Sequence, residues 1–372
     1  MNPFIIKGYL SPKYFCDREK ETTRIQGAIN NQRNLTLVSL RKMGKTGLIF
    51  NVFNELKLGN THETLYLDIY HTENLQGFIN QLGTAIFRMR KSFEAKLKEF
   101  LHNFRRIRPL VTVDPMTGNP SLSFTITSEE DARQTLEDLF AIIQYRSQKM
   151  PVVVAIDEFQ QINNYPEKNT EALIRGLIQN MHNVCFIFSG SNRTVLAGMF
   201  TDAKRPFYQS TEMMFLDEIP FDEYKHFIKA TFGKNNKDIQ DKVVEKILQW
   251  TRSHTFYVQY LCNKLFEQGT RSIDETMFYE VSGDILENNN TFYYEYRNLL
   301  TTHQWQLLKA IAKEKYIENI TSSSFIKKHN LTNPSTVRRG VQSLMEKEMI
   351  CLIKYGYYVY DPYFSRWLEM QE

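Results

Sequence analysis

The sequence lacks any apolar run long enough to cross a membrane as a helix. Apolar segments such as residues 152–156 and 184–188 have the length of a buried strand, whereas a spanning helix needs roughly 18 apolar residues or more. Residues 1–7 also lack the basic region and the long apolar core of a secretory signal. We therefore expect neither a membrane partner nor an export signal.

Cysteine is scarce, and the four cysteines lie far apart in the sequence. None of the short spacings of metal-binding or redox motifs occurs among Cys16, Cys185, Cys262 and Cys351. Because isolated thiols are typical of a reducing compartment, we expect a cytoplasmic protein.

An excess of charge is also missing. The formal net charge is only +4 over 372 residues, which by itself does not indicate nucleic-acid binding. The sequence contains no long internal repeat and no low-complexity tract, and its length suits two or three domains. Composition therefore indicates an ordinary globular protein, and the motifs must indicate its function.

The most informative segment is residues 39–47, which read Ser-Leu-Arg-Lys-Met-Gly-Lys-Thr-Gly. An apolar run precedes it and an apolar-periodic segment follows it, so the pattern predicts strand, loop and helix. Such a loop directs backbone N–H groups at phosphates, and the helix N-terminus adds positive potential. Lys45 would then reach the β- and γ-phosphates, and the Thr46 hydroxyl would ligate Mg²⁺. The segment predicts a site for a nucleoside triphosphate with Mg²⁺; the alternative is a chance Gly-Lys-Thr at a helix start.

The phosphate loop departs from its usual pattern at one position, because Ser39 stands where the first glycine is expected. If that position required a positive φ, a non-glycine residue would cost about 1–2 kcal/mol. A loop anchored on both sides would tolerate this cost.

A second motif lies at residues 151–158, an apolar run that ends in Asp157 and Glu158. The β-branched residues predict a buried parallel strand. Its carboxyl end is where open α/β sheets bind ligands. Asp157 could hold Mg²⁺, and Glu158 could orient or deprotonate an attacking water. A solvated acidic turn at the end of a strand is the alternative.

The order of the segments predicts a doubly wound α/β fold, because strand-like and helix-like segments alternate over residues 1–218. A Pro/Gly turn between two alternating runs predicts a β-hairpin insertion at about 108–127, which could contact a partner or pack on its own sheet. The predicted parallel strands are residues 35–39, 64–69, 151–158, 184–191 and 213–216. The predicted helices are residues 19–30, 45–58, 75–104, 128–148 and 170–182.

After Pro220 the strand signals stop, and we predict an α-helical lid over residues 219–290. Residues 291–372 then predict three helices and a small hairpin, the outline of a winged helix-turn-helix. The lid helices are predicted at about 221–232, 239–250, 257–266 and 273–286. The C-terminal helices are predicted at about 305–312, 322–329 and 333–347, before strands at 351–354 and 357–360.

The third C-terminal helix has an amphipathic pattern, with Val337, Val341 and Leu344 on one face. Arginine and glutamine side chains are suited to phosphates and base edges. Duplex DNA and an intramolecular lid contact remain two alternatives for this domain. The outward residues, and so the candidate DNA contacts, are Ser335, Arg338, Arg339 and Gln342.

With these motifs, the chain resembles the AAA-type P-loop ATPases of the archaeal and bacterial ATPase family, relatives of the STAND switch ATPases and of origin-recognition initiators. The resemblance covers essentially the whole chain. It rests on residues 14–21 as an entry box, on the form basic-basic-hydrophobic-Gly-Lys-Thr at residues 41–46, and on the acidic strand end followed by Phe159 and Gln160. It implies ATP hydrolysis with Mg²⁺, and ATP and ADP as ligands.

The resemblance also implies roles for individual residues. Asp17 and Arg18 would lie near the adenine, although a helix-start acid with a solvated arginine is the alternative. Ser191 or Asn192 would sense the γ-phosphate after the strand beside the acidic one. The expected nucleotide-contacting residues of the phosphate loop are Arg41, Lys42, Met43, Gly44, Lys45, Thr46 and Gly47.

The sequence departs from the family pattern in the lid, where Ser253-His254-Thr255 lacks the usual proline. His254 could approach the nucleotide, or it could cap a helix or pack. The usual Gly-Arg after the sensor strand is absent as well, so Arg193 and Arg205 are both candidates for the transition-state arginine.

Three functions agree with these features. The chain could be an ATP-hydrolysing switch or motor, a DNA-binding regulator set by nucleotide binding alone, or a signalling scaffold whose C-terminal domain binds protein only. Self-association is a further expectation for its partners. Rapid ATP turnover would favour the first function, and salt-dependent DNA binding would separate the other two.

Overall fold

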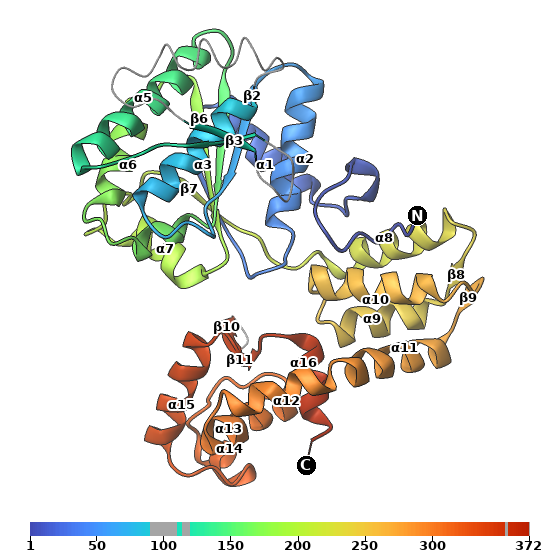
Figure 1. Ribbon diagram of the computed structural model, residues 1–372. Helices are drawn as coiled ribbons and strands as arrows, with labels where there is room; N and C mark the ends of the chain where they lie inside the picture. Colours follow the sequence, from blue (N-terminus) through green and yellow to red (C-terminus); the bar gives the residue numbers. More distant parts are fainter. Residues whose placement is uncertain (90–109, 114–119, 354–355, 372) are drawn as a thin grey trace. The chain divides into compact units, whose positions relative to one another are not determined.

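The computed structural model describes residues 1–89, 110–113, 120–353 and 356–371 (Figure 1). By its internal contacts the chain divides into two compact units. One unit is Gly8–Asp217; the other combines Met1–Lys7 with Glu218–Glu372. No helix in the described ranges is both long and apolar enough to span a membrane.

The first unit is built on a five-stranded sheet with the strand order β2-β5-β6-β1-β7. All its neighbouring strands pair in parallel, which confirms the predicted doubly wound fold. Strands β1, β5 and β6 are buried along their whole length, and this burial explains why their sequences are nearly continuous apolar runs. The strands are β1 (Leu35–Val38), β2 (Glu63–Asp68), β5 (Val152–Asp157), β6 (Val184–Gly190) and β7 (Glu212–Phe215).

Helices cover both faces of this sheet (Figure 1). On β6, Cys185 and Ile187 enter the core beneath α1 and α2, while Phe186 and Phe188 enter the opposite core, because successive side chains of a strand alternate. The helices are α1 (Glu19–Asn30), α2 (Lys45–Leu58), α3 (Leu75–Arg88), α5 (Glu129–Ser147), α6 (Thr170–Ile178) and α7 (Arg193–Thr201). Two short 3₁₀ helices are η1 (Pro12–Tyr14) and η2 (Phe159–Asn164).

The predicted hairpin forms between β3 (Leu110–Val113) and β4 (Pro120–Ser123). It packs on α3 rather than on the sheet. Thr84 Oγ1 accepts a hydrogen bond from the Leu122 backbone N–H at 2.9 Å, and Phe124 is buried. A side chain at Gly83 would collide with the Phe124 ring at 2.6 Å, so this glycine permits the close approach. The predicted helix over 75–104 continues to Arg88, and its remainder lies outside the described residues.

The second unit is mainly helical, but the expectation that strands stop after Pro220 is wrong in one detail. Two residues of β8 (Asp238–Ile239) pair in parallel with β9 (Ser272–Ile273). Such a short ladder leaves no periodic pattern in the sequence. The lid helices are α8 (Phe221–Gly233), α9 (Asp241–Trp250), α10 (Thr255–Glu267) and α11 (Glu275–Asn288).

The C-terminal segment has the predicted helices and hairpin together with two helices that were not predicted, α12 (Asn290–Asn298) and α16 (Pro362–Glu369). The polar residues near position 289 indicated a boundary; Asn289 is the C-cap of α11 and the N-cap of α12, which begins at Asn290. Tyr293 of α12 packs against Phe364 and Trp367 of α16 in tilted ring contacts. The other elements are α13 (Thr302–Glu314), α14 (Ser323–Lys328), α15 (Pro334–Glu346), β10 (Ile350–Ile353) and β11 (Gly356–Val359).

Two partly buried arginines bind the lid to the C-terminal elements within this unit. Arg252, which follows α9, donates to the Val359 carbonyl at 2.7 Å and to Ser365 Oγ at 2.6 Å. Arg366 Nε donates to the Trp250 carbonyl at 3.2 Å. The division at residue 290 into a lid and a winged-helix domain therefore stays a prediction, because the contacts group both in one unit.

Candidate active site

The phosphate loop turns directly from β1 into α2. Gly44 has φ 94° and is the N-cap of α2, and Lys45 is the first residue of that helix. The cost considered for Ser39 does not arise, because Ser39 is not among the residues with positive φ. Lys42 instead adopts φ 60°. Ser39 is buried, and its hydroxyl donates to the Leu40 carbonyl at 2.7 Å. The serine therefore replaces glycine at a position that does not need one.

The Lys45 side chain is buried, with only 6% of its surface exposed. Burial lowers the pKa of its ammonium group, and the nearby charges of Asp157 and Glu158 act in the opposite direction. Within the described residues, no hydrogen bond or ion pair engages this ammonium. A buried cation without a direct partner at a helix N-terminus is suited to receive an anion.

Asp157, at the end of β5, joins the phosphate loop to the acidic strand. Its Oδ2 accepts from Thr46 Oγ1 at 2.9 Å and from the Tyr66 hydroxyl at 2.9 Å. Its Oδ1 accepts from Ser189 Oγ at 2.6 Å and from the Glu158 backbone N–H at 3.1 Å. Three strands and the helix α2 thus fix one buried carboxylate.

Glu158 lies just beyond the strand, in the left-handed region with φ 56°. Its Oε2 accepts from Gln160 Nε2 at 2.5 Å, from Ser191 Oγ at 2.8 Å and from the Ser191 backbone N–H at 3.3 Å. Its Oε1 receives no hydrogen bond from the described residues. One oxygen therefore anchors the side chain, and the other is left for chemistry. A non-glycine residue with positive φ is common at active sites, where the surrounding contacts hold the strain.

Three residues of this network were not predicted from the sequence, namely Tyr66, Ser189 and Gln160. Burial, and next the charge of Asp157, raise the pKa of the Tyr66 hydroxyl well above its usual value, so it remains a proton donor. The available signals were a tyrosine in the strand that pairs with β5 and a serine at the end of an otherwise apolar strand. Neither identifies its partner without the register, which pairs Asp68 with Asp157.

Asp68 adds a third carboxylate at this edge of the sheet. Burial raises the pKa of its carboxyl group, and the charges of Asp157 and Glu158 add to this effect. The edge therefore carries three acids, of which Asp157 and Glu158 act on the buried Lys45 ammonium, and this arrangement is suited to a cation accompanied by phosphates.

The donor atoms of Thr46 and Asp157 fit Mg²⁺. A hydroxyl and a carboxylate are hard oxygen ligands, and Mg²⁺ is typically bound by one or two protein groups with waters and substrate phosphates. Across the described residues, no group of three His, Cys, Asp or Glu side chains could form an all-protein metal site. The set of one hydroxyl and one carboxylate thus leaves the remaining Mg²⁺ ligands to waters and phosphates.

The two candidate arginines have partners away from these residues. Arg205 forms an ion pair with Glu171 at 2.6 Å and a hydrogen bond with Asn163. Arg193 lies over the Phe215 ring at 5.7 Å and 3.6 Å from the Asp217 carboxylate. Neither assignment as the transition-state arginine is tested by this geometry, so both stay predictions.

Asn192 and the entry-box residues also have structural partners. The Asn192 side chain caps α7 by accepting from the Val195 N–H at 3.1 Å. The Arg18 guanidinium is buried and donates to Glu21 at 2.6 Å and to the Asp217 carbonyl at 2.7 Å. Asp17 precedes it with φ 49°. Their roles toward a nucleotide remain predictions.

The remaining nucleotide candidates divide between the two units. In the phosphate loop, Arg41 and Lys42 are exposed and Met43 is buried, and Arg41 Nε lies 3.4 Å from Ser191 Oγ. Gly47 lies under the Phe15 ring, where an added side chain would meet it at 3.4 Å. In the second unit, His254 is buried and its ring packs on Tyr257 and Tyr360.

The predicted faces of α15 are confirmed. Its apolar residues Val337, Val341 and Leu344 are buried. Among the candidate DNA contacts, the Ser335 hydroxyl donates to Asn333 at 2.6 Å and Gln342 donates to Glu346 at 3.1 Å. All four of these outward residues, which are Ser335, Arg338, Arg339 and Gln342, are exposed.

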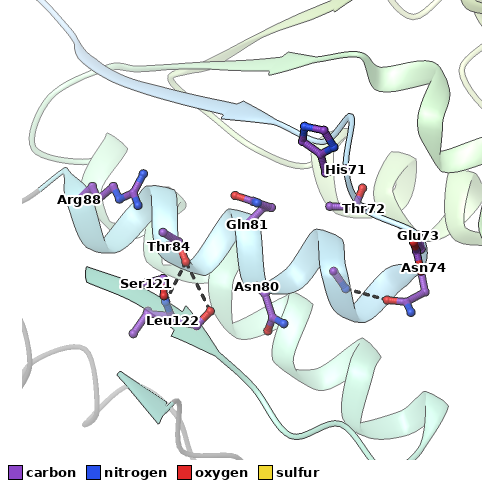
Figure 2. A pocket seen from close by; sticks show the side chains of 11 residues that line it. His71, Thr72, Glu73, Asn74, Asn80, Gln81, Thr84, Arg88, Ser121 and Leu122 are labelled. Atoms are coloured by element: carbon purple, nitrogen blue, oxygen red, sulfur yellow. Dashed lines mark hydrogen bonds between the residues drawn. The ribbon is translucent and has the colours of Figure 1, made fainter. Parts of the chain in front are cut away.

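A separate hollow of about 430 Å³ follows α3 beside the hairpin (Figure 2). Figure 2 shows Arg88 at one end of the hollow, Glu73 and Asn74 at the other, and further polar side chains between them. The Asn80 side-chain oxygen accepts a hydrogen bond from the Phe124 N–H at 2.9 Å, and the Asn74 side chain caps α3. The hollow thus lies where side chains of α3 form hydrogen bonds with the backbone at the edge of β4.

The parallel sheet, the phosphate loop and the paired acids define a P-loop ATPase. Residues 15–261 match the family described as an ATPase domain predominantly from Archaea, and residues 291–370 match a probable winged helix domain. Because the first match covers more than half of the chain, the protein belongs to this ATPase family. It is accordingly an ATP-hydrolysing enzyme with a C-terminal winged helix domain.

Solved structures show the same fold at low sequence identity. The Walker-type ATPase PABY2304 of Pyrococcus abyssi is 16% identical with a TM-score of 0.69, over 99% of this chain and 100% of that chain. The ORC2 protein of Aeropyrum pernix, in ADPNP–ADP complexes, is 13% identical with a TM-score of 0.56, over 99% and 95%. The ORC1 protein of Aeropyrum pernix in complex with DNA is 13% identical with a TM-score of 0.52, over 96% and 94%. No curated protein matches this chain.

Proposed function

We propose that this ATPase is a molecular switch in which the nucleotide state of the P-loop unit controls duplex DNA binding by the winged helix. The observation that carries the nucleotide half is the 2.9 Å hydrogen bond from Thr46 to Asp157, which lies 111 residues away, beside a buried lysine. The observation that carries the DNA half is the exposed polar face of α15.

In the proposed reaction, the backbone N–H groups at the start of α2 and the Lys45 ammonium bind the terminal phosphates of ATP. Thr46 and Asp157 would hold Mg²⁺, which when bound would neutralise phosphate charge. Glu158 orients the attacking water and accepts its proton at the open Oε1. Ser191 and Gln160 keep that carboxylate in place through Oε2.

The coupling rests on the contacts between the lid and the C-terminal elements within the second unit. Arg252 binds both β11 and α16, and its guanidinium lies over the Tyr358 ring at 5.2 Å. A displacement of the lid would thus carry the winged helix with it, because packed cores and charged hydrogen bonds resist continuous deformation. The family resemblance to origin-recognition initiators, together with the A. pernix ORC1–DNA complex, supports DNA as the partner.

The DNA half is tested by the double variant Arg338→Ala with Arg339→Ala. If α15 contacts the duplex, DNA affinity should fall and the slope of log affinity against log salt should flatten by roughly two counterions. ATP turnover without DNA should stay unchanged. The measurement is a gel-shift titration at two salt concentrations, beside an ATPase assay.

The matched control is Lys313→Ala with Lys315→Ala, which removes two exposed cations at the end of α13 in the same domain. This control should retain the salt slope of the parent protein. If the parent does not bind duplex DNA, and the arginine variant instead alters turnover or ADP release, the winged helix is an intramolecular lid and the DNA proposal is wrong.

The coupling half is tested by Arg252→Ala. Loss of the guanidinium leaves the Val359 carbonyl without its charged donor, so unfolding of the second unit should become easier by roughly 1–3 kcal/mol. DNA affinity should also become equal in the presence of ATP and ADP. Denaturant unfolding and DNA titrations with each nucleotide measure both effects, with exposed Arg271→Ala as the control. A variant that keeps the nucleotide dependence of the parent would contradict this coupling route.

A further inference from the structure

The carboxylate of Asp157 has no spare acceptor position. Each of its oxygens accepts two hydrogen bonds, from Thr46 and Tyr66 at Oδ2 and from Ser189 and the Glu158 N–H at Oδ1. An ionised carboxylate offers about four lone-pair positions in total. A metal ion, or a water bound to one, can reach this carboxylate only where an existing donor gives way.

The four donors differ in how readily each can be released. Ser189 lies on the buried strand β6, and the Glu158 N–H belongs to the adjoining peptide, so both donors at Oδ1 are fixed. Thr46 can keep its proton on Oδ2 while its oxygen lone pairs face a metal. The Tyr66 hydroxyl is therefore the donor whose hydrogen bond competes directly with the metal shell.

The position of the Tyr66 ring makes this competition persistent. The ring packs against Phe50 of α2, with ring centroids 4.7 Å apart. The phenol is consequently held beside Oδ2, and the hydroxyl cannot leave without disturbing the contact between β2 and α2. Removing only the hydroxyl would free one acceptor position and keep the ring contact.

We infer that Tyr66 is a positioning residue that restrains Asp157 and thereby raises the Mg²⁺ concentration needed for tight ATP binding. The inference rests on the proposed Mg²⁺–ATP site. The tyrosine thereby sets the Mg²⁺ concentration that the site requires. Tight nucleotide binding occurs only where Mg²⁺ is abundant enough to displace the phenol from Asp157.

The test compares the parent protein with Tyr66→Phe by calorimetric titration of ATP at a series of free Mg²⁺ concentrations, from excess chelator upward. The variant should reach half of its Mg²⁺-dependent gain in ATP affinity at on the order of tenfold less Mg²⁺, because a hydrogen bond to a charged group no longer opposes the metal. Its ATP affinity in chelator should equal that of the parent. A purely structural effect of the substitution would change the ATP affinity both in chelator and with Mg²⁺.

The matched control is Tyr165→Phe. Tyr165 is a buried tyrosine of the same unit whose hydroxyl shares a hydrogen bond with Thr72 instead of Asp157. This control should keep the Mg²⁺ requirement of the parent, even if it lowers stability.

Two results would overturn the inference, and they have different meanings. An unchanged or higher Mg²⁺ requirement in Tyr66→Phe, with a Mg²⁺-dependent parent, would show that the tyrosine does not compete and would leave the proposed site intact. A parent protein whose ATP affinity does not depend on Mg²⁺ would overturn the proposed metal site and this inference with it.

Discussion

Glu158→Gln should bind ATP as tightly as the parent protein and hydrolyse it more slowly by on the order of 10²-fold or more. The substitution keeps the shape of the side chain and leaves an oxygen that Ser191 can still contact. It removes the base, however, because an amide cannot accept the proton of the attacking water. The open Oε1 of Glu158 is the atom on which this expectation depends, since Oε2 is engaged by Gln160 and Ser191.

Single-turnover hydrolysis and calorimetric ATP titration measure the two halves of this expectation. Glu137→Gln removes one carboxylate from the surface of α5, where Glu137 pairs with Arg133, and should leave both measurements unchanged. Wild-type turnover in Glu158→Gln would place the general base on another residue, and Asp68 would then be the next carboxylate to examine because it lies at the same edge of the sheet.

The sequence predicts the scaffold of this site because the scaffold depends on local patterns. Strand β5 is recognisable as a continuous apolar run, and its two terminal acids could be placed at the carboxyl edge of a parallel sheet. Helix α2 is recognisable from Lys45 onward by its apolar periodicity. These features depend only on residues that are close together in the sequence, so no information about long-range contacts was needed.

The hydrogen-bond network around the acids could not be predicted in the same way. Tyr66 and Ser189 lie 91 and 32 residues from Asp157 along the chain, and they meet it because β2, β5 and β6 are adjacent in the sheet. The strand order and register decide this, and neither is encoded in a local pattern. Ser39 illustrates the reverse case: the cost considered for a non-glycine residue at that position does not arise, and the positive φ values of the loop are at Lys42 and Gly44.

The missed elements have local explanations too. Helix α16 begins at Pro362, after the N-cap Asp361, and is rich in aromatic residues, which are typical of strands such as the preceding one. Helix α7 is short and begins with the cap residue Asn192, which the family resemblance had assigned to phosphate sensing. The sequence pattern at Asn192 is the same whether the side chain caps a helix or contacts a phosphate, because both roles place asparagine directly after the strand.

Lys45→Ala should abolish tight ATP binding. Lys45 is the only buried cation at the start of α2 among the described residues, and its charge lies beside two carboxylates that would otherwise repel the phosphates. Without it, the γ-phosphate would face Asp157 and Glu158 with only backbone N–H groups to stabilise it. We expect ATP affinity to fall by on the order of 10²-fold or more, as a charge-assisted contact in a dry site requires.

The control for this prediction is Lys57→Ala, which removes an exposed lysine at the opposite end of the same helix and should leave ATP affinity unchanged. Thermal unfolding without nucleotide separates binding from folding. Burial lowers the pKa of the Lys45 ammonium, which means that the folded protein disfavours the charged form, so Lys45→Ala should unfold at the same temperature as the parent or higher. ATP affinity equal to that of the parent in such a folded variant would remove Lys45 from the binding site, and with it the phosphate-loop assignment on which the proposed switch depends.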